Sequence, residues 1–158
     1  MSKGKGNRRL VVIGGVAAGM SAAARARRLD PDLEIVAYER SGYVSYGSCG
    51  LPYLISLVVP EPEDLVVRTP EQFGKQGIET HTHHEVTSID VSQQTVKVKD
   101  LDEGREFTVP YERLVVATGG VAVEPPMPGT DLEGVFSLRT VEDGIEVNRF
   151  LAENSPRR

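Results

Sequence analysis

The sequence has no second cysteine and no long apolar run, and each of these absences excludes a class of protein. Cys49 has no second cysteine with which to form an internal disulfide, so a reducing cytoplasm is the expected location. No apolar run approaches the roughly 20 residues that a membrane-spanning helix requires. The basic start of the chain is not followed by the apolar stretch and small-residue cleavage site of a signal peptide, so none is expected. The net charge of −5 argues against a nucleic-acid or membrane-surface binder. The 158 residues therefore predict a soluble, globular domain.

Small and apolar residues dominate the stretch L-V-V-I-G-G-V-A-A-G-M-S-A-A-A. Leu10–Ile13 predicts a buried parallel strand, the two following glycines a sharp turn, and residues 17–29 a helix. Unpaired N–H groups and the positive end of the helix dipole face such a turn, which can therefore hold a phosphate. The fingerprint G-x-G-x-x-G is only partly kept, because Gly14 and Gly19 hold its first and third positions but Val16 holds the second. A tight turn without a ligand is the alternative interpretation.

An acidic residue stands where a dinucleotide-binding domain needs one. Leu33–Tyr38 is a second apolar strand, and it is followed by Glu39, 20 residues after Gly19. At that spacing a carboxylate accepts hydrogen bonds from the adenosine ribose hydroxyls. An ordinary surface carboxylate is the alternative.

The remaining chain completes an α/β pattern. Thr69 is expected to cap a helix, and residues 135–138 and 140–151 are expected to form a last strand and a last helix capped by Thr140. We expect a central parallel sheet and a three-stranded antiparallel meander in place of one crossover helix; the parallel strands are predicted at 10–14, 33–38, 78–81 and 114–118, and the meander at 86–109.

Cys49 lies in the polar segment S-Y-G-S-C-G-L-P-Y, ahead of a possible helix at 51–57. A helix N-terminus stabilises a thiolate, so the segment favours a reactive thiol over an inert, buried cysteine. His81 and His83 share one face of a strand, but no cysteine or carboxylate pattern completes a metal site. We therefore predict no metal.

Several segments together resemble the FAD-dependent pyridine nucleotide–disulfide oxidoreductases. They are G-G-V-A-A-G-M-S-A-A, the strand end at Glu39, S-Y-G-S-C-G-L-P-Y, V-R-T-P-E-Q-F, H-H-E-V and L-V-V-A-T-G. The most similar branch has a single cysteine and includes coenzyme A-disulfide reductases, NADH oxidases and NADH peroxidases. The branch with a C-x-x-x-x-C pair does not fit, because Leu54 stands five residues after Cys49. The resemblance implies a Rossmann-like FAD-binding domain, preceded by a flexible leader and followed by a tail or linker to an NADH domain outside this chain, with boundaries at 1–9, 10–152 and 153–158.

The resemblance also implies roles for individual residues in binding FAD. Four residues of the glycine turn would hold the pyrophosphate: Gly14, Ala17, Ala18 and Gly19. Glu39 would bind the ribose with Arg40 beside the adenine, and the backbone of Val86 would contact the adenine. Three residues match the A-T-G strand end near the flavin: Ala117, Thr118 and Gly119.

A second set of residues would hold the substrate. Cys49 would be the redox centre, with Ser45 and Ser48 lining the thiol site. Coenzyme A-disulfide reductases also tolerate valine at the position of Val16, and their coenzyme A lies along the helix that would carry Ser21, Arg25 and Arg28. A solvated helix face is the alternative for Arg25, Arg27 and Arg28.

The implied function is that of an enzyme in which NAD(P)H reduces FAD, and FAD reduces a disulfide or sulfenate centred on Cys49. The substrate would be coenzyme A disulfide or, in an oxidase or peroxidase, oxygen or peroxide. The longer enzyme would be a homodimer, and this chain alone is not expected to turn over. A non-catalytic FAD-binding redox module and an apo structural domain are the alternatives.

Overall fold

The computed structural model describes residues 8–155 and divides the chain into two compact units. We call residues 8–46 and 68–119 the sheet unit, and residues 47–67 and 120–155 the helical unit. The sheet unit contains β1 (Arg9–Ile13), α1 (Ala17–Leu29), β2 (Glu34–Tyr38), α3 (Pro70–Gly74), β3 (Ile78–His81), β4 (His84–Asp90), β5 (Thr95–Asp100), β6 (Glu106–Pro110) and β7 (Arg113–Val116). The helical unit contains the 3-10 turns η1 (Ser48–Gly50) and η2 (Pro62–Leu65) and the helices α2 (Leu51–Ile55) and α4 (Val141–Asn154).

Four parallel strands form the main sheet, in the order β3-β2-β1-β7. β1 lies between β2 and β7, with Val11 opposite Val36 on one side and Leu114 on the other. The predicted interior position of the apolar first strand is therefore confirmed. β1 begins at Arg9, inside the predicted leader, and Arg9 pairs with Glu34 of β2. Residues 1–7 of that leader lie outside the described part of the chain.

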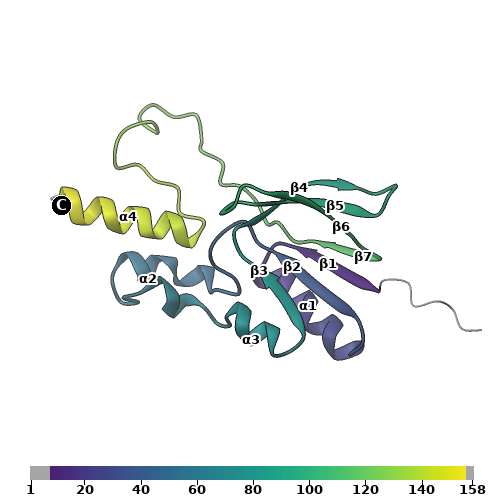
Figure 1. Ribbon diagram of the computed structural model, residues 1–158. Helices are drawn as coiled ribbons and strands as arrows, with labels where there is room; N and C mark the ends of the chain where they lie inside the picture. Colours follow the sequence, from purple (N-terminus) through teal and green to yellow (C-terminus); the bar gives the residue numbers. More distant parts are fainter. Residues whose placement is uncertain (1–7, 156–158) are drawn as a thin grey trace, which may run out of the picture. The chain divides into compact units, whose positions relative to one another are not determined.

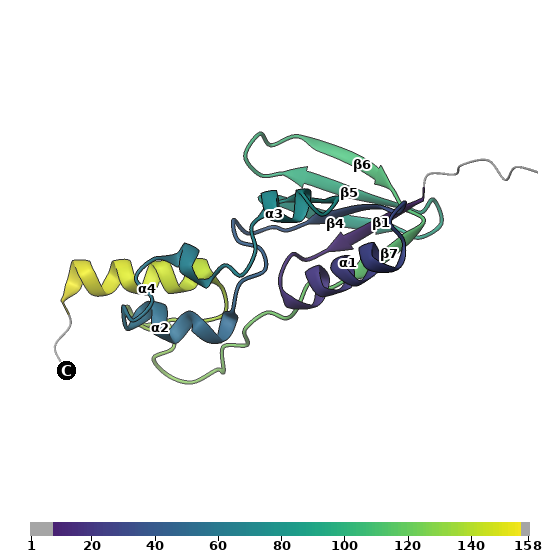
Figure 2. The same cartoon turned by 90° about the horizontal axis from the view of Figure 1, so that it is seen from below.

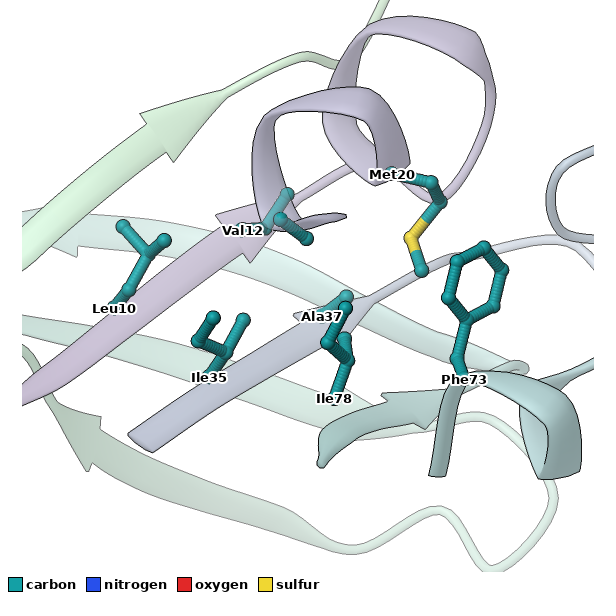
Figure 3. Close-up of a cluster of buried hydrophobic side chains, with 8 residues drawn as sticks. Leu10, Val12, Met20, Ile35, Ala37, Phe73 and Ile78 are labelled. Carbon is teal, nitrogen blue, oxygen red and sulfur yellow. The ribbon is translucent and has the colours of Figure 1, made fainter. Parts of the chain in front are cut away.

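Side chains on the two faces of this sheet enter two separate cores. α1 and α3 cover one face (Figure 1), and the core between them and the sheet is drawn in Figure 3. It consists of Leu10, Val12, Met20, Ala23, Ile35, Ala37, Phe73 and Ile78. Because successive strand residues point to opposite faces, Val11, Ile13, Val36 and Tyr38 enter the other core, with Val96, Val98 and Val109 of the antiparallel sheet.

The antiparallel sheet is the predicted meander, in the order β4-β5-β6. It covers the face of the main sheet opposite α1 (Figure 1) and stands in the chain between β3 and β7, where a crossover helix would otherwise lie. β4 carries an irregularity in register between Val86 and Ser88.

The helical unit is built from α2 and α4, which lie side by side in Figure 2 as in Figure 1. A Cβ added to Gly144 would lie 3.1 Å from Leu54 Cδ2, so a glycine lets the two helices approach closely. Asn148 Nδ2 also donates to the Leu54 carbonyl at 3.0 Å. Thr140 forms the capping box of α4, as predicted.

One predicted element is wrong. Residues 135–138 form no strand, and residues 47–67 and 120–155 contain no other strand with which they could pair. The Val135 amide instead donates to the Leu132 carbonyl at 3.2 Å in a turn. Within residues 8–155, no helix is both long and apolar enough to cross a membrane.

Candidate functional site

The turn between β1 and α1 depends on glycine at its first position. Gly14 has φ of 104°, and its amide donates to the Tyr38 carbonyl at 2.9 Å. A Cβ at Gly14 would lie 2.3 Å from the carbonyl oxygen of Ala117 and 3.2 Å from the Thr118 nitrogen. Ala117 is itself fixed by a 2.7 Å hydrogen bond from its amide to the Ile13 carbonyl. The structure thus brings Gly14, Ala117 and Thr118 together at the carboxyl ends of β1 and β7.

The start of α1 is the next part of the site. A Cβ at Gly19 would lie 1.9 Å from the Gly14 carbonyl oxygen, so only glycine allows the helix to start this close to the turn. Val16 is the N-cap and supplies no side-chain hydrogen bond, and the first turn holds no acidic residue. Ala17 and Ala18 are exposed. The first N–H groups of α1 are therefore not capped by a side chain, which is the arrangement that binds anions.

Glu39 follows β2 and lies against this turn. Its Oε2 accepts the Gly15 amide at 2.6 Å, and its Oε1 accepts the Ser41 amide at 2.9 Å. The Glu39 backbone is held by the His81 carbonyl at 2.8 Å and the His84 amide at 2.9 Å. Two residues beyond His84, Val86 lies half-buried in β4. The backbone of Glu39 and the segment that leads to Val86 are thus neighbours.

These features fit the pyrophosphate and ribose of a dinucleotide such as FAD. Gly14 and Gly19 let the backbones of β1, α1 and the strand end after β7 meet too closely for any Cβ, and the first turn of α1 holds no acidic residue of its own. Each oxygen of Glu39 holds one N–H and retains acceptor capacity for a hydroxyl. Arg40 is exposed beside Glu39, and Gly119 continues the strand end with φ of 70°.

The outer face of α1 carries the residues predicted to hold substrate. Ser21, Arg25 and Arg28 are exposed and recur at helical spacing, so they share one face. Within residues 8–155, neither the Arg25 nor the Arg28 guanidinium has a hydrogen bond or an ion pair. Both guanidinium groups are available to an anionic ligand.

Arg27 is different, and the solvated-face interpretation is wrong for it. Its guanidinium donates to the carbonyls of Pro31, Leu33 and Gly77, each at 2.6 Å. It therefore ties the end of α1 to the starts of β2 and β3. Sequence reasoning missed this role, because the three carbonyls are recruited by the fold and no motif marks them.

Cys49 lies in the helical unit, within η1 and directly ahead of α2, and its thiol is exposed. Leu65 fixes this loop, because the Gly47 amide donates to the Leu65 carbonyl at 2.9 Å. Ser48 is exposed beside Cys49, whereas Ser45 belongs to the sheet unit. That both serines line the thiol site stays a prediction.

An aromatic cluster adjoins the Glu39 segment and was not foreseen. The Tyr38 ring stacks on His81 at 5.3 Å between centroids, and His81 lies 5.0 Å from His84. Burial, with the nearby Glu79 carboxylate, raises the pKa of Tyr38 to about 12. No group of three or more His, Cys, Asp or Glu side chains that could hold a metal occurs among residues 8–155.

The chain is similar to known proteins of one family. A sequence model of the family described as pyridine nucleotide-disulphide oxidoreductase matches residues 8–156. An NADH oxidase of Methanocaldococcus jannaschii is 37% identical over 148 residues, which make up 92% of this chain and 33% of that protein. A coenzyme A disulfide reductase of Staphylococcus haemolyticus is 34% identical over 152 residues, 96% of this chain and 34% of that protein. The chain therefore spans about a third of the length of these curated relatives.

Solved structures give the same result. The crystal structure of reduced Bacillus anthracis CoADR-RHD matches with a TM-score of 0.90 at 35% identity, covering 96% of this chain and 28% of that chain. A NAD-dependent persulfide reductase from A. fulgidus matches with a TM-score of 0.84 at 39% identity, covering 92% of this chain and 27% of that chain.

Proposed function

Because the chain belongs to the pyridine nucleotide-disulphide oxidoreductase family, which is FAD-dependent and uses NAD(P)H, we propose that the sheet unit binds FAD. The observation that carries this proposal is the turn between β1 and α1. Gly14 and Gly19 stand where a Cβ would clash with backbone atoms, and the start of α1 has no side-chain cap. The carboxylate of Glu39 lies beside the turn and accepts the Gly15 amide.

Each part of FAD has candidate partners in this turn or in the segments next to it. The first amides of α1, including those of Ala17 and Ala18, are assigned to the pyrophosphate. Glu39 is assigned to the ribose hydroxyls, since a carboxylate is a pure acceptor. Val86 and Arg40 are assigned to the adenine, and the strand end after β7 to the flavin.

The redox step is assigned to Cys49. Its thiolate attacks one sulfur of a disulfide substrate, so that a bond forms to Sγ and the other sulfur leaves as a thiolate. A hydride equivalent from NAD(P)H then reduces this mixed disulfide, which returns the Cys49 thiolate and releases a second thiol. The chemistry that bound FAD would supply is the transfer of that electron pair from the nicotinamide to sulfur.

Coenzyme A disulfide is the proposed substrate. The support is the exposed face of α1, where Ser21, Arg25 and Arg28 offer two unpaired cations for the phosphates of coenzyme A. An NADH oxidase or peroxidase is the second candidate, because an NADH oxidase is among the most similar relatives. In that case Cys49 becomes a sulfenic acid and the two arginines matter little. The proposed cytoplasmic location rests on the single cysteine, and the proposed homodimer of the longer enzyme rests on the family resemblance.

The binding part is tested by flavin retention. The purified chain is mixed with FAD, passed over a desalting column and measured for bound flavin. Glu39→Ala should weaken binding roughly tenfold or more, since hydrogen bonds to a charged group contribute about 1.5–3 kcal/mol. Glu34→Ala, at the other end of β2, is the matched control. Equal affinity of the Glu39 variant and the control would remove Glu39 from the site.

The substrate is tested by mass spectrometry of protein purified without reductant. A coenzyme A adduct that disappears in Cys49→Ser supports the disulfide reductase. An added oxygen on Cys49 supports the oxidase or peroxidase instead.

A further inference from the structure

Gly15, the second glycine of the turn, is held at both its amide and its carbonyl by one short loop. Its amide donates to Glu39 Oε2 at 2.6 Å, and its carbonyl accepts the Ser45 amide at 2.8 Å. Gly15 is buried, and a Cβ there would lie 2.7 Å from Val44 Cγ1 and 2.8 Å from Glu39 Cβ. Residues 39–45 therefore enclose Gly15 on both sides.

The loop is itself held in shape by local hydrogen bonds. The second carboxylate oxygen of Glu39 accepts the Ser41 amide at 2.9 Å, and Ser41 Oγ donates to the Tyr43 carbonyl at 3.1 Å. Ser45 has φ of 50°, a left-handed conformation that is uncommon for a residue other than glycine. Such a conformation persists where the surrounding structure fixes it, and here the Ser45 amide donates to the Gly15 carbonyl.

We propose that Glu39 and Ser45 form a clasp on Gly15 that holds the glycine turn in its pyrophosphate-binding shape before a nucleotide arrives. The inference rests on the proposed function and deepens it. Glu39 is a positioning residue for the phosphates as well as the acceptor for the ribose. Its loss weakens binding of the phosphate part even when no ribose hydroxyl is present.

The clasp is tested first without any nucleotide, by amide hydrogen exchange of the 158-residue chain measured by NMR. Glu39→Met keeps the unbranched aliphatic stem and removes both carboxylate acceptors. Protection of the Gly15 amide should fall roughly tenfold or more, because a hydrogen bond to a charged group is lost. Glu34→Met is the control, because Glu34 lies at the other end of β2, and it should leave the protection of Gly15 unchanged. Retained protection of Val11 and Val36 verifies that each variant is folded, and unchanged protection of Gly15 in Glu39→Met overturns the clasp.

The positioning role is tested with two probes, ADP and 2′,3′-dideoxy-ADP, titrated into the same variants. If Glu39 served only the ribose, Glu39→Met would lose affinity for ADP alone. The clasp predicts a loss for dideoxy-ADP too, again roughly tenfold; unchanged affinity for dideoxy-ADP refutes the positioning role. Failure of the wild-type chain to bind either probe would count against the proposed function, while the exchange of the Gly15 amide still decides whether the clasp exists.

Discussion

Gly19→Ala adds one methyl group at the point where α1 meets the glycine turn. The new Cβ would lie 1.9 Å from the Gly14 carbonyl oxygen, and must move by about 1.1 Å to reach even the 3.0 Å limit that real Cβ contacts respect. The obstacle is backbone, so it cannot rotate away. Overpacking of this kind costs about 1–3 kcal/mol, whereas alanine improves helix propensity by about 1 kcal/mol over glycine. Because the clash is with backbone, we expect an overpacking cost of about 3 kcal/mol. Less the gain in helix propensity, the net loss in the free energy of unfolding is about 2 kcal/mol.

The assay for Gly19→Ala is urea unfolding followed by circular dichroism, together with FAD affinity. Gly74→Ala is the matched control, because Gly74 ends α3 and nothing lies within 4 Å of its added Cβ. The control should be neutral or more stable by up to about 1 kcal/mol, with FAD affinity unchanged. Wild-type stability and FAD affinity in Gly19→Ala would show that α1 does not start against Gly14, and would refute the geometry of the site.

Other perturbations test the supports of the site. Arg27→Met removes donors to three carbonyls and should cost about 2 kcal/mol in urea unfolding, whereas Arg25→Met should stay within about 0.5 kcal/mol of wild type. Equal effects would contradict the separate roles of the two arginines. The Asp100 carboxylate accepts hydrogen bonds from the backbone amides of Glu103 and Asp102. These bonds, the one from Glu103 most strongly, lower the pKa of Asp100 below 3.8. Stability should therefore fall as the pH drops below 3.8 toward that lowered pKa, and Asp100→Asn should lack this loss in acid-unfolding curves. Since the pKa of Tyr38 is raised to about 12 from 10.0, stability should fall between these values as the pH rises. An ultraviolet titration should find a phenol that ionises near pH 12, and Tyr38→Phe should abolish that step.

Much of the fold could be predicted because the signals are local. The apolar run at 10–13 predicted the interior strand, and alternating residues at 86–109 predicted the meander. Both depend only on which faces of a strand are buried. The strand predicted at residues 135–138 was wrong because local sequence does not show whether a pairing partner is present. V-F-S-L has strand-like composition, but a strand also requires a neighbour, and the fold of the helical unit places none beside it.

The three arginines of α1 mark the limit of prediction for the site. Arg25, Arg27 and Arg28 differ little in sequence context, yet only Arg27 reaches backbone carbonyls. One of those carbonyls belongs to Gly77, 50 positions away, so the choice among the three depends on where β3 returns beside β2. Helical periodicity predicts that Arg25 and Arg28 share a face. It does not predict which of the three guanidinium groups forms hydrogen bonds within the fold.

The same limit applies to the clasp, and it bears on how Glu39 is interpreted. Spacing from Gly19 assigned Glu39 to a ribose, because that spacing reports the length of one β-α-β unit. The contact with Gly15 depends instead on the path of the loop after β2, which includes a left-handed serine at position 45. A serine seldom adopts this conformation, so it depends on the surrounding loop, in which the Ser45 amide donates to the Gly15 carbonyl. If Glu39 binds the ribose as proposed, its carboxylate is already oriented by the two amides that it accepts, so binding would require less ordering of the protein than at a free surface glutamate.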